Sequence, residues 1–146
     1  MENCIFCRII KGEIPAAKVY EDDLVLAFLD IAPINYGHVL VIPKEHHESS
    51  STIPEATAGR MFRIGSRIGI ALKRKLDYDA FNLHLADGTA AGQVVMHAHL
   101  HVVPRGVEDG FHWNWRQLKY PDGKLAGTAA TLAERLAADL EQNSGK

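Results

Sequence analysis

Three histidines alternate with apolar residues between His97 and His101. Successive side chains of an extended strand point to opposite faces, so the imidazoles of His97, His99 and His101 should share one face. Such close imidazoles repel one another when protonated, and each needs hydrogen-bond partners when it is buried and neutral. Two chemistries suit the arrangement: metal binding by imidazoles, or nucleophilic attack on phosphorus with neighbouring imidazoles as donors and proton carriers.

The loop before these histidines, from Asp87 to Gln93, consists of small residues and contains Gly88 and Gly92. Glycines allow a backbone to turn so that its N–H groups approach an anion closely, and phosphate is the natural guest of such a loop. The loop therefore favours phosphorus chemistry over metal binding at the three histidines.

The only two cysteines, Cys4 and Cys7, form a C-x-x-C motif. In a reducing compartment, two close thiols indicate metal ligands or a redox pair rather than a disulfide. The redox motif should follow a strand, and only three residues precede Cys4 here. Zinc needs four ligands and this motif supplies two, so a metal site and two buried thiols both remain open from the motif alone.

The elements that must position these residues are short strands and one long helix. Strands are expected at Lys18–Glu21, Leu24–Leu29, Val39–Ile42 within Gly37–Pro43, Ala80–Leu85 and Val94–Val103, the last ended by Pro104. Helices are expected at Cys4–Ile10, about Pro54–Leu76 and Thr128–Leu140. Because the strands mostly follow one another, the pattern favours an α+β domain, an antiparallel sheet with helices on one side.

Length and composition fit a single domain. The chain has 146 residues, a formal net charge of -2 and 47% hydrophobic residues. Acidic and basic residues are mixed, so we expect no duplex nucleic acid partner. We expect no membrane partner either, since no apolar run approaches the length of a span. The first residues lack the basic and then apolar pattern of a signal peptide, which favours a cytoplasmic protein.

The chain resembles the histidine triad (HIT) family of nucleotide hydrolases and transferases. The family motif, His-φ-His-φ-His-φ-φ with φ apolar, is matched in full by residues 97–103. Further similarities are the opening segment 4–15, the segment 26–31, the segment 37–44 and Ala91-Gly92-Gln93. The resemblance covers Cys4 to about Arg105. It implies one HIT domain over residues 1–146, with a core over about 4–105, a C-terminal tail over about 106–146, and pairing into a homodimer.

The resemblance also implies roles for individual residues. His99 matches the nucleophile that takes the nucleotidyl group from the α-phosphate, and His101 matches a phosphate-contacting histidine. Asp30 matches the carboxylate that binds the ribose hydroxyls. The expected walls of the base pocket are Phe6, Phe28, Leu29 and Ile31. Gly92 and Gln93 belong to the loop beside the phosphate.

Members with an N-terminal cysteine pair imply a zinc site of Cys4, Cys7, His46 and His97. A tetrahedral set of four protein ligands leaves no position for water, so this zinc would be structural. His99 and His101 would remain free for chemistry. A metallohydrolase that uses all three triad histidines on metal is a separate hypothesis.

Two positions depart from the family. Many members have Asn or Ser where this chain has Ala86, and some have Ser where it has Val94. The expected function is attack on the α-phosphate of a nucleoside phosphoramidate or dinucleoside polyphosphate, releasing a nucleoside monophosphate, with adenosine as the expected nucleoside. The departures favour an alternative, a nucleotide-sensing or partner-binding protein with incidental catalysis. The aromatic segment Phe111–Trp115 fits a surface tail, and the resemblance leaves contact with the substrate open, because such tails can lie near the active site in the family.

Overall fold

The structure of the chain is a computed structural model that describes residues 4–114 and 116–143, so Trp115 lies outside the described residues. Residues 1–111 and 112–146 form two compact units.

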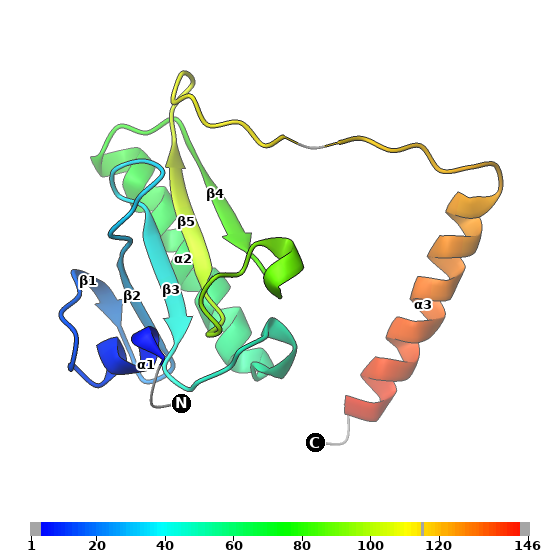
Figure 1. Cartoon of the computed structure of the whole chain (residues 1–146), viewed down its shortest axis with the longest axis horizontal. Coiled ribbons are helices and arrows are strands. Elements are labelled where there is room, and N and C mark those ends of the chain that lie inside the picture. Colours follow the sequence, from blue (N-terminus) through cyan, green and yellow to red (C-terminus); the bar gives the residue numbers. More distant parts are fainter. Residues whose placement is uncertain (1–3, 115, 144–146) are drawn as a thin grey trace. The chain divides into compact units, whose positions relative to one another are not determined.

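The first unit contains a five-stranded antiparallel sheet in the order β1-β2-β3-β5-β4 (Figure 1). The strands are β1 (Lys18–Glu21), β2 (Val25–Leu29), β3 (Val39–Pro43), β4 (Ala80–Leu85) and β5 (Leu100–Arg105). The helices of this unit are α1 (Ile5–Ile10) and α2 (Glu55–Lys75), with two 3-10 turns, η1 (Ser50–Thr52) and η2 (Thr89–Ala91). The expected α+β fold is confirmed.

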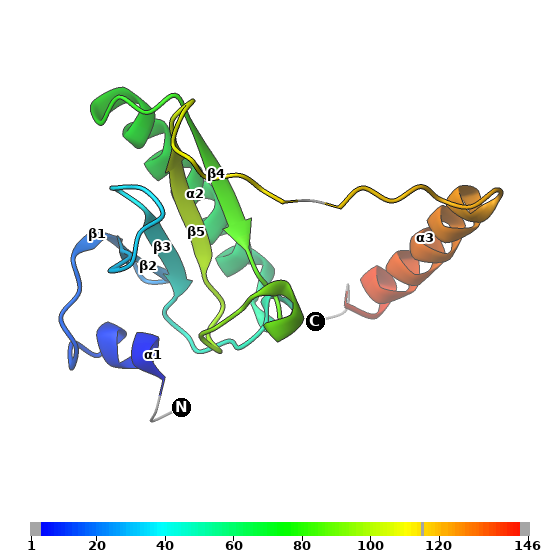
Figure 2. The same ribbon diagram turned by 45° about the horizontal axis from the view of Figure 1, so that its top comes forward.

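The two helices of this unit lie on opposite faces of the sheet (Figure 2). The long helix α2 packs its buried residues Met61, Ile64 and Leu72 against one face. The short helix α1 packs Phe6 and Ile9 against the other face. The expected placement of helices on one side therefore holds for α2 but not for α1.

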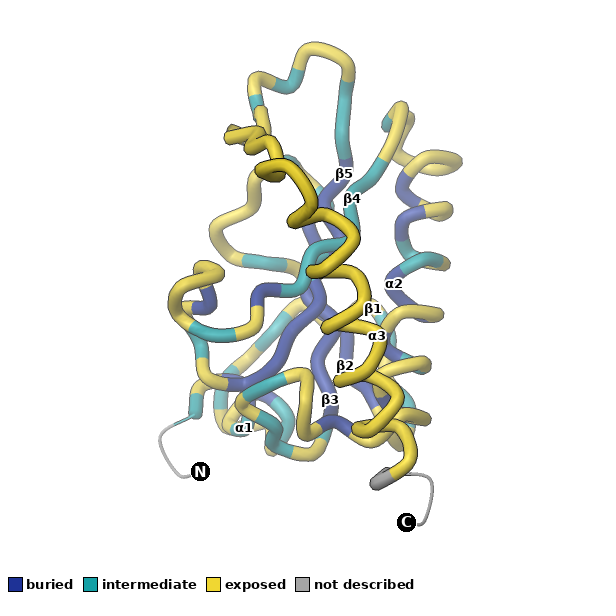
Figure 3. The backbone as a smooth tube through the Cα atoms, turned by 90° about the vertical axis from the view of Figure 1, so that its right-hand side faces the viewer, coloured by how far each residue is buried: buried dark blue, intermediate teal, exposed yellow. Residues whose placement is uncertain are grey.

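The central strands explain this two-sided packing. Residues 25–28 of β2 and all of β3 are buried, as the dark blue stretches of Figure 3 show. A continuous apolar run, without polar alternation, is typical of a strand covered on both faces. The sheet therefore has two cores, and α1 is needed to cover the second.

Two glycines let α2 approach the sheet closely. A Cβ atom built at Gly69 would lie 2.4 Å from the Phe81 ring on β4, and one built at Gly65 would lie 2.8 Å from Leu100 Cδ2 on β5. Contacts this short do not occur in packed interiors, so a larger residue at Gly69 would have to displace an aromatic ring. The helix α2 can therefore lie this close to β4 and to β5, the strand that bears His101, only because Gly65 and Gly69 have no side chains.

The last strand differs from its expected range at both ends. It begins at Leu100 rather than Val94, because residues 94–99 turn locally: the His97 N–H donates to the Val95 carbonyl at 2.9 Å. The strand continues through Pro104, where the expectation placed its end. The carbonyl of Pro104 accepts from the Asn35 side chain at 2.8 Å. The N–H and the carbonyl of one strand residue point to the same side. The N–H that Pro104 lacks would therefore point towards β3, whose pairing with β5 ends at Val102, so no ladder hydrogen bond is lost.

The second unit contains one helix, α3 (Lys124–Asn143), which begins four residues earlier and ends three residues later than the expected Thr128–Leu140. Four leucines recur along it and are all exposed: Leu125, Leu132, Leu136 and Leu140. Among the described residues, no helix is both long and apolar enough to span a membrane.

Candidate active site and metal cluster

The three histidines of the motif lie on one side of the backbone, although only His101 belongs to a strand. The alternate residues Ala98, Leu100 and Val102 are buried in the core beneath α2. On the opposite side, the rings of His99 and His101 meet with centroids 4.8 Å apart. The Phe6 ring of α1 contacts His99 edge-on, with centroids 5.4 Å apart. The alternation of side chains between the two faces therefore continues through residues 97–99, although these residues are not part of a strand.

His99 has a fixed tautomer. Its Nδ1 lies 2.7 Å from the backbone carbonyl oxygen of His97, and a carbonyl can only accept. The proton of the neutral ring must therefore sit on Nδ1, which leaves a lone pair on Nε2. The side chain is buried and lines an apolar cavity. A neutral imidazole with a free Nε2 lone pair is the form that a nucleophile requires.

His101 has the opposite arrangement, which is set by His38. The Ile34 N–H donates to His38 Nδ1 at 3.2 Å, so the proton of a neutral His38 is on Nε2. That Nε2–H donates to His101 Nδ1 at 2.9 Å. His101 therefore carries its own proton on Nε2 and can donate it to an anion. Sequence reasoning assigned His38 no role.

Burial keeps His38 and His101 neutral near neutral pH, because it lowers the pKa of both rings. It lowers the pKa of His101 to about 4, with further lowering by the neighbouring His99, His38 and His84 and an opposing effect of Asp30. Burial also lowers the pKa of His38, against the opposing charge of Asp30. The donor arrangement described above is therefore the one present near neutral pH.

The lowered pKa of His101 predicts a loss of stability in acid. The unfolded chain binds a proton at His101 near pH 6.5, whereas the folded protein does so only near pH 4, so the unfolding free energy should fall as pH drops between these values. His101→Asn should make this decline shallower in urea unfolding measured from about pH 7 to 4.5. His112→Asn, at an exposed histidine of the second unit, should leave the decline unchanged. Equal pH dependence in wild type and His101→Asn would contradict the assignment.

A cavity of about 630 Å³ opens between α1, β2 and the histidines. It contains most of the residues expected to bind a nucleotide: Phe6, Phe28, Leu29, Asp30, Ile31, Gly92, His99 and His101. Its remaining wall is apolar, with Ile5, Ile9, Ile14, Pro15, Ala16, Ala17, Ala32, Leu40, Val94 and Val95. Phe6 and Phe28 also belong to the second core, whereas Ile31 is 99% exposed at the rim. A site of this size and composition suits a small ligand with an apolar ring.

The Asp30 carboxylate stabilises a local turn at the cavity wall and keeps free acceptor capacity towards the cavity. Its Oδ1 accepts from the Ala32 N–H at 2.9 Å, which is the local turn typical of aspartate. Its Oδ2 lies 3.8 Å from His38 Nδ1. The carboxylate therefore has lone pairs left for a ligand hydroxyl, while the turn holds it in place.

The glycine loop does not present its N–H groups as expected. The N–H groups of Ala91, Gly92 and Gln93 donate to carbonyls within the loop, and that of Gly88 donates to the Gln93 side chain. Gly88 and Gly92 have φ of 85° and 92°, so they permit the turn itself. Gln93 is buried and is absent from the cavity wall, in contrast to Gly92.

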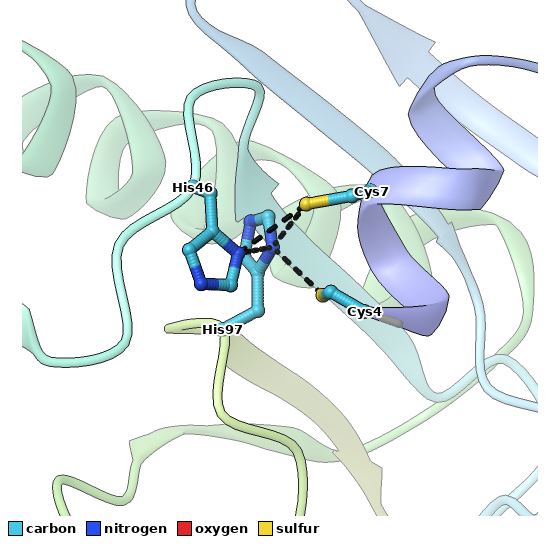
Figure 4. Close-up of side chains that lie close together, drawn as sticks. All are labelled: Cys4, Cys7, His46 and His97. Carbon is cyan, nitrogen blue, oxygen red and sulfur yellow. Dashed lines mark hydrogen bonds between the residues drawn. The ribbon is translucent and has the colours of Figure 1, made fainter. Parts of the chain in front are cut away.

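A second cluster lies beside the cavity, where Cys4, Cys7, His46 and His97 bring their ligand atoms within 4.8 Å of one another (Figure 4). His97 Nε2 lies 2.9 Å from the Pro43 carbonyl, so its proton is on Nε2 and its Nδ1 lone pair faces the two sulfurs at 3.5 and 3.7 Å. His46 Nδ1 lies 3.3 Å from both Cys7 Sγ and His97 Nδ1.

The donor set of this cluster fits zinc. Burial lowers the pKa of His97 to about 4, which keeps its ring neutral and able to donate a lone pair. His46 Nδ1 and His97 Nδ1 face the same space 3.3 Å apart, so one cation there can accept a lone pair from each ring. Two thiolates and two imidazoles are the ligands that zinc takes in closed tetrahedral sites.

Known proteins share both the sequence and the fold. The HIT domain family model matches residues 11–107, more than half of the chain. The chain belongs to the HIT family. A crystal structure of a HIT family protein from Bacillus anthracis is 42% identical, covers 92% of this chain and 97% of that chain, and superposes with a TM-score of 0.85.

Two further relatives of this HIT protein have informative names. A Zn-bound histidine triad family protein from Mycobacterium smegmatis is 39% identical, with a TM-score of 0.71 over 94% of this chain and 98% of that chain. Adenylylsulfatase HINT3 from Arabidopsis thaliana is 38% identical over 130 residues, which are 89% of this chain and 66% of that protein. The family thus includes an enzyme named for a nucleotidyl substrate and a zinc-bound member.

Proposed function

We propose that the protein is a nucleotide hydrolase or transferase in which His99 attacks the α-phosphorus of a nucleotide bound in the cavity. The observation that carries the proposal is the 2.7 Å hydrogen bond from His99 Nδ1 to the His97 carbonyl, which leaves Nε2 as an unprotonated nucleophile in an apolar cavity. The expected substrates are nucleoside phosphoramidates or dinucleoside polyphosphates, with adenosine as the expected nucleoside.

The reaction has two steps. His99 Nε2 forms a bond to the α-phosphorus, the bond to the leaving group breaks, and the leaving group departs with its electron pair and takes up a proton. Water then attacks the nucleotidyl-histidine and releases the nucleoside monophosphate, which restores the lone pair on Nε2. The Nε2–H of His101 donates to a phosphoryl oxygen and stabilises the charge that develops there.

A single-turnover assay tests this proposal. The protein is mixed in excess with a fluorogenic nucleoside phosphoramidate, with and without a chelator, and the mixture is quenched for mass spectrometry. We expect a transient adduct of one nucleoside monophosphate on the peptide that contains His99, unaffected by the chelator. Slow release of the fluorophore without an adduct would favour the nucleotide-sensing alternative.

The role of Asp30 is tested with ribose analogues. Asp30→Ala should weaken ribonucleotide binding by about 1–3 kcal/mol, because the carboxylate no longer accepts from the ribose hydroxyls. Asp30→Asn is the matched control, because an amide oxygen can still accept from the Ala32 N–H. Binding is measured by calorimetry with AMP and 2′-deoxy-AMP. Equal losses for both nucleotides would show that the effect comes from the turn and not from the ribose.

We further propose that the protein is a homodimer joined through α2 and β4. The outer edge of β4 pairs with no strand among residues 4–111, and an exposed sheet edge invites pairing. Beside it lies an apolar groove of about 300 Å³ that includes Phe62, Leu83 and Leu85, and Phe62 is 62% exposed. Phe62→Glu should shift the protein towards monomer in light scattering at micromolar concentration. A wild-type protein that is already monomeric would refute the proposal.

A further inference from the structure

Gln93 makes three hydrogen bonds with its side-chain amide, all to backbone groups. Oε1 accepts from the Gly88 N–H at 2.7 Å, and Nε2 donates to the carbonyls of Glu48 at 2.7 Å and Val95 at 3.0 Å. The residue is only 4% exposed. The partners also fix the orientation of the amide, because an N–H must face its oxygen and carbonyls must face its nitrogen.

One of these bonds, to the Glu48 carbonyl, connects the loop beside the cavity to a neighbouring segment, residues 47–50. Asp87, at the other end of the same loop, accepts from the N–H of Ser50 at 2.9 Å and from the hydroxyls of Ser49 and Ser50. The Ala98 N–H, within the histidine motif, donates to the His47 carbonyl at 2.6 Å. The loop and the histidines are therefore both held by the chain that follows His46.

We propose that Gln93 is a positioning residue, which keeps its three backbone partners in the nucleotide complex and so holds the cavity wall from Gly92 to Val95 in place beside His99. It does not contact the phosphate. The inference rests on the proposed function for the identity of the ligand, but the hydrogen bonds that define it exist without one. It replaces the expectation that the Gln93 side chain lies beside the phosphate.

Removing the amide should move the wall. Gln93→Met keeps a side chain of similar length but removes the partner of the Gly88 N–H, the Nε2–H donor to the Glu48 carbonyl and one of the two donors to the Val95 carbonyl, which keeps only the His97 N–H. Each lost hydrogen bond favours a local rearrangement. A displaced wall misplaces the phosphorus relative to Nε2 of His99, which should lower kcat by about tenfold. Gln117→Met, at an exposed glutamine of the second unit, is the matched control.

The experiment has three readouts. Nuclear magnetic resonance of the nucleotide-free protein should show shifted amide signals for Gly88 and Val95 in Gln93→Met but not in Gln117→Met. Single-turnover kinetics well below the melting temperature should show the fall in kcat. A crystal structure of wild type with AMP should keep the Gln93 amide on Glu48 and Val95.

Each contrary result is decisive. A Gln93 amide on a phosphate oxygen in the AMP complex, unshifted Gly88 and Val95 signals, or an unchanged kcat in the folded variant would overturn the positioning role. A wild-type protein that neither binds AMP nor turns over the phosphoramidate would refute the proposed function instead. In that case the amide signals alone decide whether Gln93 positions the loop.

Discussion

Replacing His99 with alanine should lower turnover by orders of magnitude, on the order of 10³-fold or more, while AMP binding largely survives. The reason is that the variant loses the only atom that forms the covalent bond, whereas the apolar cavity keeps most of its wall. Turnover is measured with a nucleoside phosphoramidate under single-turnover conditions, and AMP binding by calorimetry. His101→Ala should have a smaller effect, because it removes a hydrogen-bond donor and not the attacking nitrogen.

A rescue experiment separates chemistry from misfolding. His99→Gly leaves a space into which added imidazole can diffuse, and the small molecule should restore part of the turnover and carry the nucleotidyl group away. Imidazole should not rescue His101→Ala to the same extent. A His99→Ala protein that retains a tenth of wild-type turnover or more would show that another residue is the nucleophile.

Removing both thiols of the metal cluster should have the second large effect, on stability. Cys4→Ser with Cys7→Ser should lower the unfolding free energy by about 2–4 kcal/mol and the melting temperature by several degrees. A bound zinc would tie α1 to the segment that bears His97, and without it α1 is held mainly by Phe6 and Ile9 in the second core. Turnover at low temperature should fall only modestly, because a closed four-ligand site offers no position for substrate.

Metal analysis and a chelator provide the controls. Wild-type protein purified without chelator should contain one zinc per chain. Chelation should lower its melting temperature to that of the double variant, and should not change the double variant further. Wild type without stoichiometric zinc would remove the proposed site. Complete loss of activity on removing zinc from a protein that stays folded would favour the metallohydrolase hypothesis.

The sequence predicted the elements well where a local pattern determines them. The α2 helix and β4 follow from their own periodicity, and their bounds agree with expectation within a residue. The alternation of the histidines predicted their common side because it depends only on neighbouring residues. The cluster of Cys4, Cys7, His46 and His97 brings together four residues that the family resemblance had grouped.

What the sequence could not predict depends on contacts between distant segments. His38 reaches His101 only because β3 pairs with β5 and places Leu40 opposite His101. The helix α1 covers the second face of the sheet because β2 is buried on both faces. The apolar run of β2 in the sequence does not indicate which helix covers which face. Likewise, one of the three partners of the Gln93 amide is the carbonyl of Glu48, which is far away in the sequence. Family motifs identify such residues, whereas their contacts require the folded chain.

The glycines of α2 have a consequence for how sequence change should be tolerated. Gly69 lies on the opposite face of the sheet from the cavity, yet an added methyl group there would press on Phe81 in β4, the strand that pairs with β5. In a library that samples every substitution under selection for activity, Gly69 should therefore be depleted of variants as strongly as positions in the cavity wall. Among the sequences that survive selection, a residue that does not contact the substrate would then vary as little as the residues of the cavity wall.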